Sequence, residues 1–514
     1  MESDEKKLSP FLTTPLITLV LVIGLALWIF LIIVSKMPVW GDEYFTFKVS
    51  SFPIPETIKA VLSDAHPPLY WVLTNLIQSI FPNDILPLRI FSALCGILAI
   101  FFTCLIARNI RDDSHSVFDS QLIFLAIALT SPFTILFFSM ARYYALFALL
   151  VSISLYLKTS PVKSMKKTWG IIVVDTLMVY TNFLAGIVLI SGFIILISSQ
   201  KNRPSAIQSL MIFIIPWILF LPVVPALIAI FTKINAQNFF IADYGVGIKS
   251  VLTRLVYSFH VFMSGEFIYP WQPSGIIMIL TGLYLMVISL RSKSQTIPFL
   301  LLGVILPFLI VVWASVYKFS LGMEFLPSRL AFAQLGILLA IAIGLSRITM
   351  LQLKSVLLLI LMFGNLHADY KMIHRENFLH STYIIPWHEI AVDIEKQADP
   401  NTDIILFDDA SFEYELIHQS TFPQSYNVAD TSFDLNDILT YHPGSRIWFV
   451  FSRRDLTPEK KIQSYLNRLE NSGYRDTRHY NYVEESDNAI RMKERFLGRE
   501  VEKYKKEMIL FQPD

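Results

Sequence analysis

Long runs of apolar residues constrain this chain more than any other feature. Hydrophobic residues make up 54% of its 514 residues and charged residues 16%, whereas about a quarter of a soluble protein is charged. The apolar residues gather in runs of roughly 17 to 25, the length at which a helix crosses the ~30 Å hydrocarbon core of a bilayer. The sequence therefore predicts a polytopic α-helical membrane protein.

We predict about eleven transmembrane helices. The first apolar run is too long for a signal peptide and lacks a small-residue cleavage site, so we expect it to be retained. Residues 250–264 combine spaced apolar positions with Arg254 and His260, which predicts an amphipathic helix lying on the membrane. The predicted spans cover residues 11–35, 85–106, 119–138, 143–158, 169–181, 183–199, 208–230, 273–290, 297–317, 329–346 and 352–366.

The distribution of Lys and Arg predicts an orientation. With the N-terminus in the cytoplasm, the connections on that side hold 14 Lys and Arg in about 55 residues. The larger loops on the opposite side, 36–84, 231–272 and 318–328, hold 7 in about 102. This bias has the sign of the positive-inside rule. We expect a multi-pass cell-membrane protein whose C-terminal region is extracytoplasmic.

The chain after about residue 367 has a different composition. Residues 368–514 hold 26 of the 41 acidic and 18 of the 42 basic residues. The segments "TDIILFDD" and "SRIWFVFS" predict short buried strands, "EKKIQSYLNRLENSG" predicts a helix ending at Gly473, and "KEMILFQP" predicts a final strand. We therefore expect a transmembrane domain over residues 1–367, including an extracytoplasmic loop 36–84, and a small α/β extracytoplasmic domain over residues 368–514.

Polar groups recur at the predicted outer ends of spans that are distant in sequence. They lie in "WGDEYF" (40–45), "HPPLYW" (66–71), "SMARYYAL" (139–146) and "LPSRLAF" (326–332). At one membrane depth these groups can form one pocket. The planar guanidinium fork of Arg suits a phosphate, and a carboxylate can deprotonate an acceptor hydroxyl. A sugar on a lipid phosphate needs no nucleotide for transfer, and we find no phosphate-binding or dinucleotide-binding glycine motif.

In this order and spacing, "GDEYFT", "HPPLYWVL", "RIFSALCGILAI" and "FFSMARYYALFALL" resemble the GT-C membrane glycosyltransferases. The branch they resemble comprises the bacterial relatives of protein O-mannosyltransferases and of the lipid A aminoarabinose transferase. The resemblance covers residues 35 to 200 and extends more loosely to "PSRLAFAQLGILLA" at 327–340. It implies transfer of a hexose or pentose from a polyprenyl-phosphate donor to a lipid, glycan or protein hydroxyl on the extracytoplasmic face, with inversion at the anomeric carbon.

The resemblance also implies roles for individual residues. Asp42 matches the catalytic base of the family, and Glu43 lies beside it. The residue before Pro-Pro-Leu-Tyr contacts the carrier phosphate, which implies this role for His66 with Tyr70 nearby. The remaining donor-phosphate residues it implies are Arg142, Tyr143 and Arg329.

The chain departs from the family pattern at two places. Asn182 follows Tyr180 and Thr181 where many relatives have His, and Leu330 follows Arg329 where Tyr is common. Some relatives use a divalent ion, but the adjacent acidic pair does not require one, so we predict no metal site and no certain cofactor. We expect membrane lipids as surroundings and no nucleic-acid partner.

Other interpretations stay open at this level. Asp42 and Glu43 can be solvated loop acids, and Arg142 and Arg329 can be anchors that reach the lipid headgroups. Asp175 lies in a predicted span, where an acid is either functional or close to the headgroup region. The alternative function is a lipid or sugar transporter or flippase, which favours charges near the bilayer centre and a two-half repeat. A third is a non-catalytic assembly protein.

Overall fold

The structure is a computed structural model in which most of the chain is described. The described residues fall into two compact units, one comprising Met1–Ser35 and Thr46–Asn377 and the other comprising Lys36–Phe45 and Phe378–Asp514. We call them the membrane unit and the C-terminal unit. The described ranges are 10–35, 37–64, 66–110, 114–162, 164–198, 204–226, 228, 248–291, 306, 308–310, 327–374, 385–419, 424–430, 433–454, 460–484, 487–497 and 504–513.

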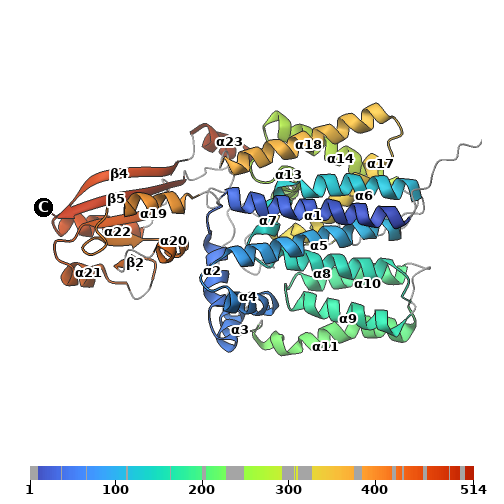
Figure 1. The fold of residues 1–514 in the computed structure, drawn as a ribbon, viewed down its shortest axis with the longest axis horizontal. Coiled ribbons are helices and arrows are strands. Elements are labelled where there is room, and N and C mark those ends of the chain that lie inside the picture. Colours follow the sequence, from blue (N-terminus) through green and yellow to red (C-terminus); the bar gives the residue numbers. More distant parts are fainter. Residues whose placement is uncertain are drawn as a thin grey trace, which may run out of the picture. The chain divides into compact units, whose positions relative to one another are not determined.

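The membrane unit is helical, and in Figure 1 its long helices run side by side with α3 and α4 at one end. The first half contains α1 (Pro10–Ser35), α2 (Gly41–Ser50, shared with the C-terminal unit), α3 (Ile54–Ser63), α4 (Leu69–Ile80), α5 (Leu86–Ile110), α6 (Ser114–Leu129), α7 (Pro132–Ser139) and α8 (Tyr144–Thr159). The second half contains α9 (Met165–Val179), α10 (Ala185–Ser198), α11 (Ala206–Phe220), η1 (Leu221–Val223), α13 (Ile248–Ser264), α14 (Pro273–Leu290), η3 (Pro327–Leu330), α17 (Ala331–Ser346) and α18 (Leu351–Ile373).

By length and composition, five helices in the described ranges can cross a membrane. A sixth is formed if α6 and α7, bent by 63°, count as one span. Helices also occupy the shorter predicted spans, while most of the predicted span 297–317 lies outside the described residues. The structure therefore confirms a polytopic helical fold with a small C-terminal sheet domain, and the number eleven stays a prediction.

Helix α17 forms the centre of the membrane unit. It is apolar on every side and buried from Ala331 to Leu345, as expected of a helix surrounded by other helices. Its one polar side chain in the core, Gln334, donates to Ser131 Oγ (2.9 Å) and accepts from the Thr134 hydroxyl (3.1 Å). Gly344 lies against the Leu285 carbonyl of α14, an approach that leaves no space for a Cβ. This packing fixes η3, which leads directly into α17.

A buried ion pair joins α8 to α9. The Lys158 ammonium lies 2.8 Å from Asp175 Oδ2 and 3.0 Å from Oδ1, and each side chain is 1% exposed. The Ser154 hydroxyl donates to Asp175 Oδ1 over 2.7 Å. The intramembrane acid noted in the sequence therefore has a cation and a hydroxyl as partners, which accounts for it structurally.

Helix α13 occupies the residues 250–264 for which an amphipathic helix was predicted. Arg254, Ser258 and His260 are buried, whereas Leu252 and Val256 are more than half exposed. Its location on the membrane stays a prediction. His260 Nε2 is hydrogen-bonded to the Ile268 carbonyl (2.8 Å), which explains why the polar face turns inward.

The C-terminal unit contains a five-stranded sheet in the order β2-β1-β3-β5-β4. Strand β1 is parallel to β2 and β3, whereas β5 is antiparallel to β3 and β4. The predicted strands and helix correspond to β1, β3, β5 and α22. The elements are α19 (Trp387–Glu395), β1 (Ile404–Phe407), α20 (Ser411–Gln419), β2 (Ser425–Asn427), α21 (Leu435–Tyr441), β3 (Ile447–Arg454), α22 (Lys460–Asn471), β4 (Tyr474–Glu484), α23 (Asp487–Leu497) and β5 (Tyr504–Pro513).

Both faces of this sheet are covered. Alternate residues of β1 point to opposite sides, so Ile404 and Leu406 pack in a cluster with α21 and α22, while Ile405 and Phe407 pack in a cluster with α19 and α20. This explains why β1 reads as a continuous apolar run. Asp408, directly after β1, accepts from the Lys506 ammonium (2.8 Å) and the Ser452 amide (2.7 Å).

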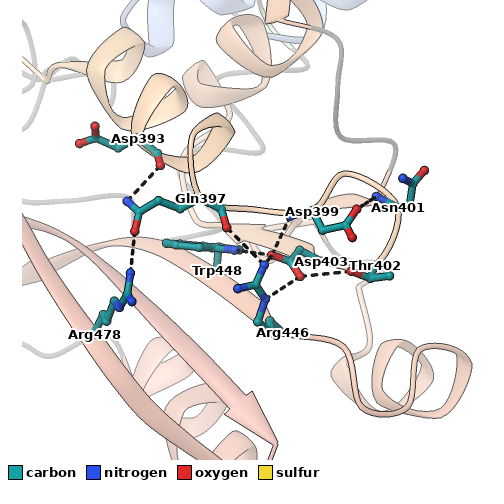
Figure 2. A network of polar contacts seen from close by, with 9 residues as sticks. All are labelled: Asp393, Gln397, Asp399, Asn401, Thr402, Asp403, Arg446, Trp448 and Arg478. Atoms are coloured by element: carbon teal, nitrogen blue, oxygen red, sulfur yellow. Dashed lines mark hydrogen bonds and ion pairs between the residues drawn. The ribbon is translucent and has the colours of Figure 1, made fainter.

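A polar network joins the segment before β1 to the sheet (Figure 2). Asp403 is 1% exposed and accepts from Arg446 Nε (2.9 Å) and Nη2 (2.7 Å), and from Trp448 Nε1 (2.9 Å). The Asp399 amide also donates to it over 3.1 Å. We call these residues the Asp403 network. Each oxygen of the Asp403 carboxylate accepts from more than one donor. The role of Asp403 is therefore structural.

Candidate functional site

The backbone brings three distant segments of the membrane unit to one place. The turn before α4 is fixed by the Leu69 amide, which donates to the Tyr180 carbonyl at the end of α9 (3.0 Å). Its two prolines fit the start of a helix, where an amide donor is not needed. The α7–α8 turn and η3 supply the other two segments, through Arg142, Tyr143 and Arg329.

Aromatic rings organise the cluster. The His66 ring stacks on Trp71 with centroids 4.9 Å apart and an interplanar angle of 17°, and it lies 5.6 Å from the Tyr143 ring. The Arg142 guanidinium lies 5.8 Å from the Trp71 centroid and 5.4 Å from that of Tyr143, within the range of cation–π attraction. We call His66, Trp71, Arg142, Tyr143 and Arg329 the arginine cluster.

The charge of the cluster comes from its two arginines. Burial holds the pKa of His66 well below its usual range, and the positive charges of Arg142 and Arg329 lower it further. The imidazole is therefore neutral at pH 7. Asp64 Oδ2 lies 3.5 Å from His66 Nε2 but is more than half exposed, so water screens it. The arginine cluster therefore has a net positive charge.

Two buried donors of the cluster lack a partner. Arg329 Nη1 and Trp71 Nε1 have no hydrogen-bond acceptor among the described residues. Such donors are costly in a folded protein unless a ligand or water accepts from them. The adjacent Ser328 hydroxyl is also buried without a partner in the described part of the chain. Donors and positive charge together suit an anion with several oxygens, such as a phosphate.

The predicted residues do not all lie in this cluster. Tyr70 is fully buried, and its hydroxyl is hydrogen-bonded to Ser92 Oγ (3.1 Å) on α5. It meets the cluster only through Trp71, against which its ring packs edge-on at 5.7 Å. Tyr70 therefore contacts the arginine cluster only indirectly, by packing against Trp71.

Asp42 and Glu43 form the first turn of α2, in the part of this helix that belongs to the C-terminal unit. Glu43 is buried, and Asp42 is half-buried. Thr46 follows Asp42 by one helical turn and belongs to the membrane unit, where its hydroxyl accepts from Arg142 Nη1 at 3.4 Å. The assignment of residues 36–84 to the transmembrane domain, as an extracytoplasmic loop, stays a prediction.

Two contributing residues were missed in the sequence. Trp71 follows Tyr70 in the motif "HPPLYW", and its position next to the matched residues was the available signal. Thr46 had no such signal, because its contact depends on the α7–α8 turn. Within the described residues, no group of three His, Cys, Asp or Glu side chains has the arrangement of a metal site.

Comparisons with known proteins agree with this fold. Residues 65–229 match the family Dolichyl-phosphate-mannose-protein mannosyltransferase. The crystal structure of ArnT from Cupriavidus metallidurans bound to undecaprenyl phosphate aligns with a TM-score of 0.53 at 12% identity, covering 97% of this chain and 98% of that chain. The apo structure of the same protein aligns with a TM-score of 0.51 at 13% identity over the same shares of the two chains.

No curated protein matches the sequence significantly. The structural likeness extends over nearly the whole chain, and the family match covers α4 to α11, the part that contains His66, Arg142 and Tyr143. Residues 65–229 are therefore similar in sequence to this family, and the chain as a whole has the fold of ArnT.

Proposed function

We propose that this protein is a glycosyltransferase that transfers a hexose or pentose from a polyprenyl-phosphate donor to an acceptor hydroxyl, with inversion. The observation that carries the proposal is the arginine cluster, in which the charges of two arginines act on a neutral imidazole and buried donors lack acceptors among the described residues. The ArnT structure to which the chain is similar contains undecaprenyl phosphate, a ligand of this chemistry.

Arg142 and Arg329 bind the donor phosphate and stabilise the charge that it gains as a leaving group. His66, neutral at pH 7, makes a hydrogen bond to a phosphate oxygen. Trp71 packs against the His66 ring, and Tyr143 packs against the Arg142 guanidinium. These contacts hold both groups in place, so the site needs little rearrangement when the phosphate binds.

Asp42 is the base in this proposal. Its carboxylate takes the proton of the acceptor hydroxyl, the oxygen bonds to the anomeric carbon, and the bond from that carbon to the phosphate oxygen breaks. One displacement inverts the anomeric centre. Glu43 is adjacent and supports the negative potential around the base. The resemblance of "GDEYFT" to the acidic motif of the family, in which Asp42 matches the base, supports this assignment.

The acceptor is a lipid, glycan or protein on the extracytoplasmic face, and the C-terminal unit lies on that face. The N-terminus is cytoplasmic in this arrangement. Single cysteines at Asp64 and at Glu470, labelled from outside intact cells by a membrane-impermeant maleimide, test it. Labelling of both supports the arrangement, and labelling of neither in intact cells but both after permeabilisation contradicts it.

The function is tested with purified full-length protein and a panel of undecaprenyl-phospho-hexoses and -pentoses. Solubilised envelope lipids and glycoproteins serve as acceptors, and released undecaprenyl phosphate is quantified by mass spectrometry. We expect transfer from one donor, and a loss of more than 100-fold in kcat for Asp42→Asn. Full activity of Asp42→Asn would exclude its role as the base, and lipid flux across proteoliposomes without a glycoside product would favour a transporter.

A further inference from the structure

One buried side chain of α17, that of Gln334, is hydrogen-bonded to both α7 and α13. Its Nε2 donates to Ser131 Oγ (2.9 Å) and to the Phe262 carbonyl (3.2 Å), and its Oε1 accepts from the Thr134 hydroxyl (3.1 Å). A carbonyl oxygen can only accept, so the contact to Phe262 fixes which end of the amide carries the nitrogen. Gln334 is 0% exposed, and hydrogen bonds in such surroundings are electrostatically stronger than in water.

The contacts to α7 hold the first turn of this helix. Ser131 is its N-cap, and the Ser131 hydroxyl oxygen also accepts from the Thr134 amide (3.4 Å). Helix α7 is only 8 residues long, and the turn that carries Arg142 follows its other end. Since the backbone hydrogen bonds of a helix keep a piece of this length rigid, the orientation that Gln334 gives to the first turn also sets the position of Arg142.

The second arginine of the cluster is connected to Gln334 through the backbone. Arg329 lies in η3, which continues directly into α17, and Gln334 follows it by five residues. A ring contact between Phe147 of α8 and Phe332 of α17, with centroids 5.2 Å apart, also joins the two parts of the chain. Gln334 thus links the segment that carries Arg142 to the segment that carries Arg329.

This link matters because the two arginines have the same charge. The positive charges of Arg142 and Arg329 both act on His66. Charges of one sign repel each other, and the repulsion is stronger inside a protein than in water. Without a bound anion this repulsion favours a wider separation of the two segments, and the hydrogen bonds of Gln334 oppose it. A site that is already held in its binding geometry loses less free energy on binding than one that must first close.

We propose that Gln334 is a positioning residue, which holds α7 and η3 together so that Arg142 and Arg329 converge on one phosphate. This inference rests on the proposed function, in which these arginines bind the donor phosphate. Gln334 itself does not contact the ligand, because both ends of its amide are already bonded to protein groups. The hydrogen bonds of Gln334 therefore act on the affinity for the phosphate and leave the affinity for the lipid chain unchanged.

The test measures dissociation constants of full-length protein for undecaprenyl phosphate and for undecaprenol, which lacks the phosphate. Gln334→Met keeps the length of the side chain without its amide, and we expect it to weaken undecaprenyl phosphate binding by roughly 10-fold or more, about the contribution of one or two hydrogen bonds. Thr134→Val removes one of the hydroxyl partners and should have a smaller effect in the same direction. Thr134→Ser keeps a hydroxyl and should bind like wild type. Undecaprenol binding should be unchanged in all three variants.

The matched control is another buried hydrogen bond of the membrane unit, between the hydroxyls of Thr103 on α5 and Ser152 on α8 (2.9 Å). Thr103→Val removes this bond as Thr134→Val removes the bond to Gln334, but the Thr103 bond does not link the segments of the two arginines. Both variants should lower the melting temperature by a similar amount, and only Thr134→Val should weaken binding of undecaprenyl phosphate. The comparison separates positioning from a loss of stability.

The outcomes distinguish this inference from the proposed function. If Gln334→Met binds undecaprenyl phosphate like wild type while Arg329→Gln does not, Gln334 has only a structural role and the proposed function stands. An equal loss of undecaprenyl phosphate and undecaprenol binding in Gln334→Met, or a loss of phosphate binding in Thr103→Val as large as in Thr134→Val, would also overturn the positioning role. Normal binding by Arg329→Gln would contradict the proposed phosphate site itself.

Discussion

The arginine cluster of the membrane unit and the Asp403 network of the C-terminal unit are two ways of burying charge. In the Asp403 network one carboxylate receives donors from Arg446, Trp448 and a backbone amide, so its hydrogen-bonding capacity is used inside the protein. In the arginine cluster two guanidinium groups lie around a neutral imidazole, and Arg329 Nη1 and Trp71 Nε1 lack acceptors among the described residues. Both sites contain buried polar groups, but only in the Asp403 network do these groups have their hydrogen-bond partners among the described residues.

This difference in hydrogen bonding distinguishes buried polar groups that stabilise the fold from buried polar groups that bind a ligand. A complete network stabilises the fold, and removing one member leaves the rest unpaired. An incomplete one is destabilising on its own, and it persists where a ligand completes it. The two sites should therefore respond oppositely to substitution: the Asp403 network in stability, and the arginine cluster in binding.

The largest expected effect is at Arg329. Arg329→Gln removes a charge-assisted contact to the phosphate worth about 3 kcal/mol, so undecaprenyl phosphate binding and transfer should fall by roughly 100-fold. Thermal stability should stay the same or rise, because a buried unpaired donor is lost. Binding and melting of full-length protein check this, with Arg291→Gln at the exposed end of α14 as control. A fall in the melting temperature with normal binding would assign Arg329 a structural role instead.

The second effect is at Asp403. Asp403→Asn removes the charge that pairs with Arg446 and replaces one acceptor oxygen by an amide donor, so it should destabilise the C-terminal unit by roughly 3 kcal/mol. Undecaprenyl phosphate binding, measured at a temperature where the variant is folded, should be unchanged. Differential scanning fluorimetry measures the shift, and Asp437→Asn, an exposed residue of α21, is the matched control. Unchanged stability would contradict the structural assignment.

A smaller effect concerns Glu266, between α13 and α14. It is buried without a partner among the described residues, and burial raises its pKa to about 8 from a usual value of 4.5. The folded state thus binds a proton that the unfolded state releases, so Glu266 lowers stability progressively as pH rises from 4.5 through 8. Glu266→Gln should raise the melting temperature at pH 8 and have little effect at pH 4.5. An equal shift at both pH values would show that the carboxyl does not titrate in this window.

The smallest effect is the pH dependence of lipid binding through His66. Its pKa is low in the free protein, and a bound phosphate would partly neutralise the arginine charges that lower it. Binding is then coupled to proton uptake, so affinity should rise severalfold as pH falls from 8 to 6. Comparing wild type with His66→Gln separates this effect from titration of the phosphate itself. Identical pH profiles for the two proteins would exclude it.

Much of the fold was predictable because the signals were local. Apolar runs gave the helices of the membrane unit, and the strands buried on both faces, such as β1, appeared as continuous apolar segments. The edge strand β4 was missed because it contains Arg475, Asp476 and Arg478, and the residues that pack in the two clusters of the sheet are tyrosines, Tyr474, Tyr480 and Tyr482. The three short helices α2 to α4 were missed because none of them is long and apolar enough for a membrane span, although the apolar residues of α3 and α4 do recur at helical spacing.

For the candidate site, sequence motifs identified the residues but not which of their side chains contact one another. His66, Arg142 and Arg329 are near one another, whereas Tyr70 turns away to Ser92. The roles of Asp42 and Glu43 stay predictions that the experiments above address.

The ion pair between Lys158 and Asp175 bears on the biogenesis of the protein. A single charge within an inserting helix costs up to about 3 kcal/mol at its centre, and Asp175 lies inside α9 while Lys158 lies in the last turn of α8, so each helix alone would partition less well into lipid than the pair. The two helices follow each other in the chain, and together they bury both charges against each other. We therefore expect them to leave the translocation channel as one hairpin, with the second helix required before the first is stably integrated.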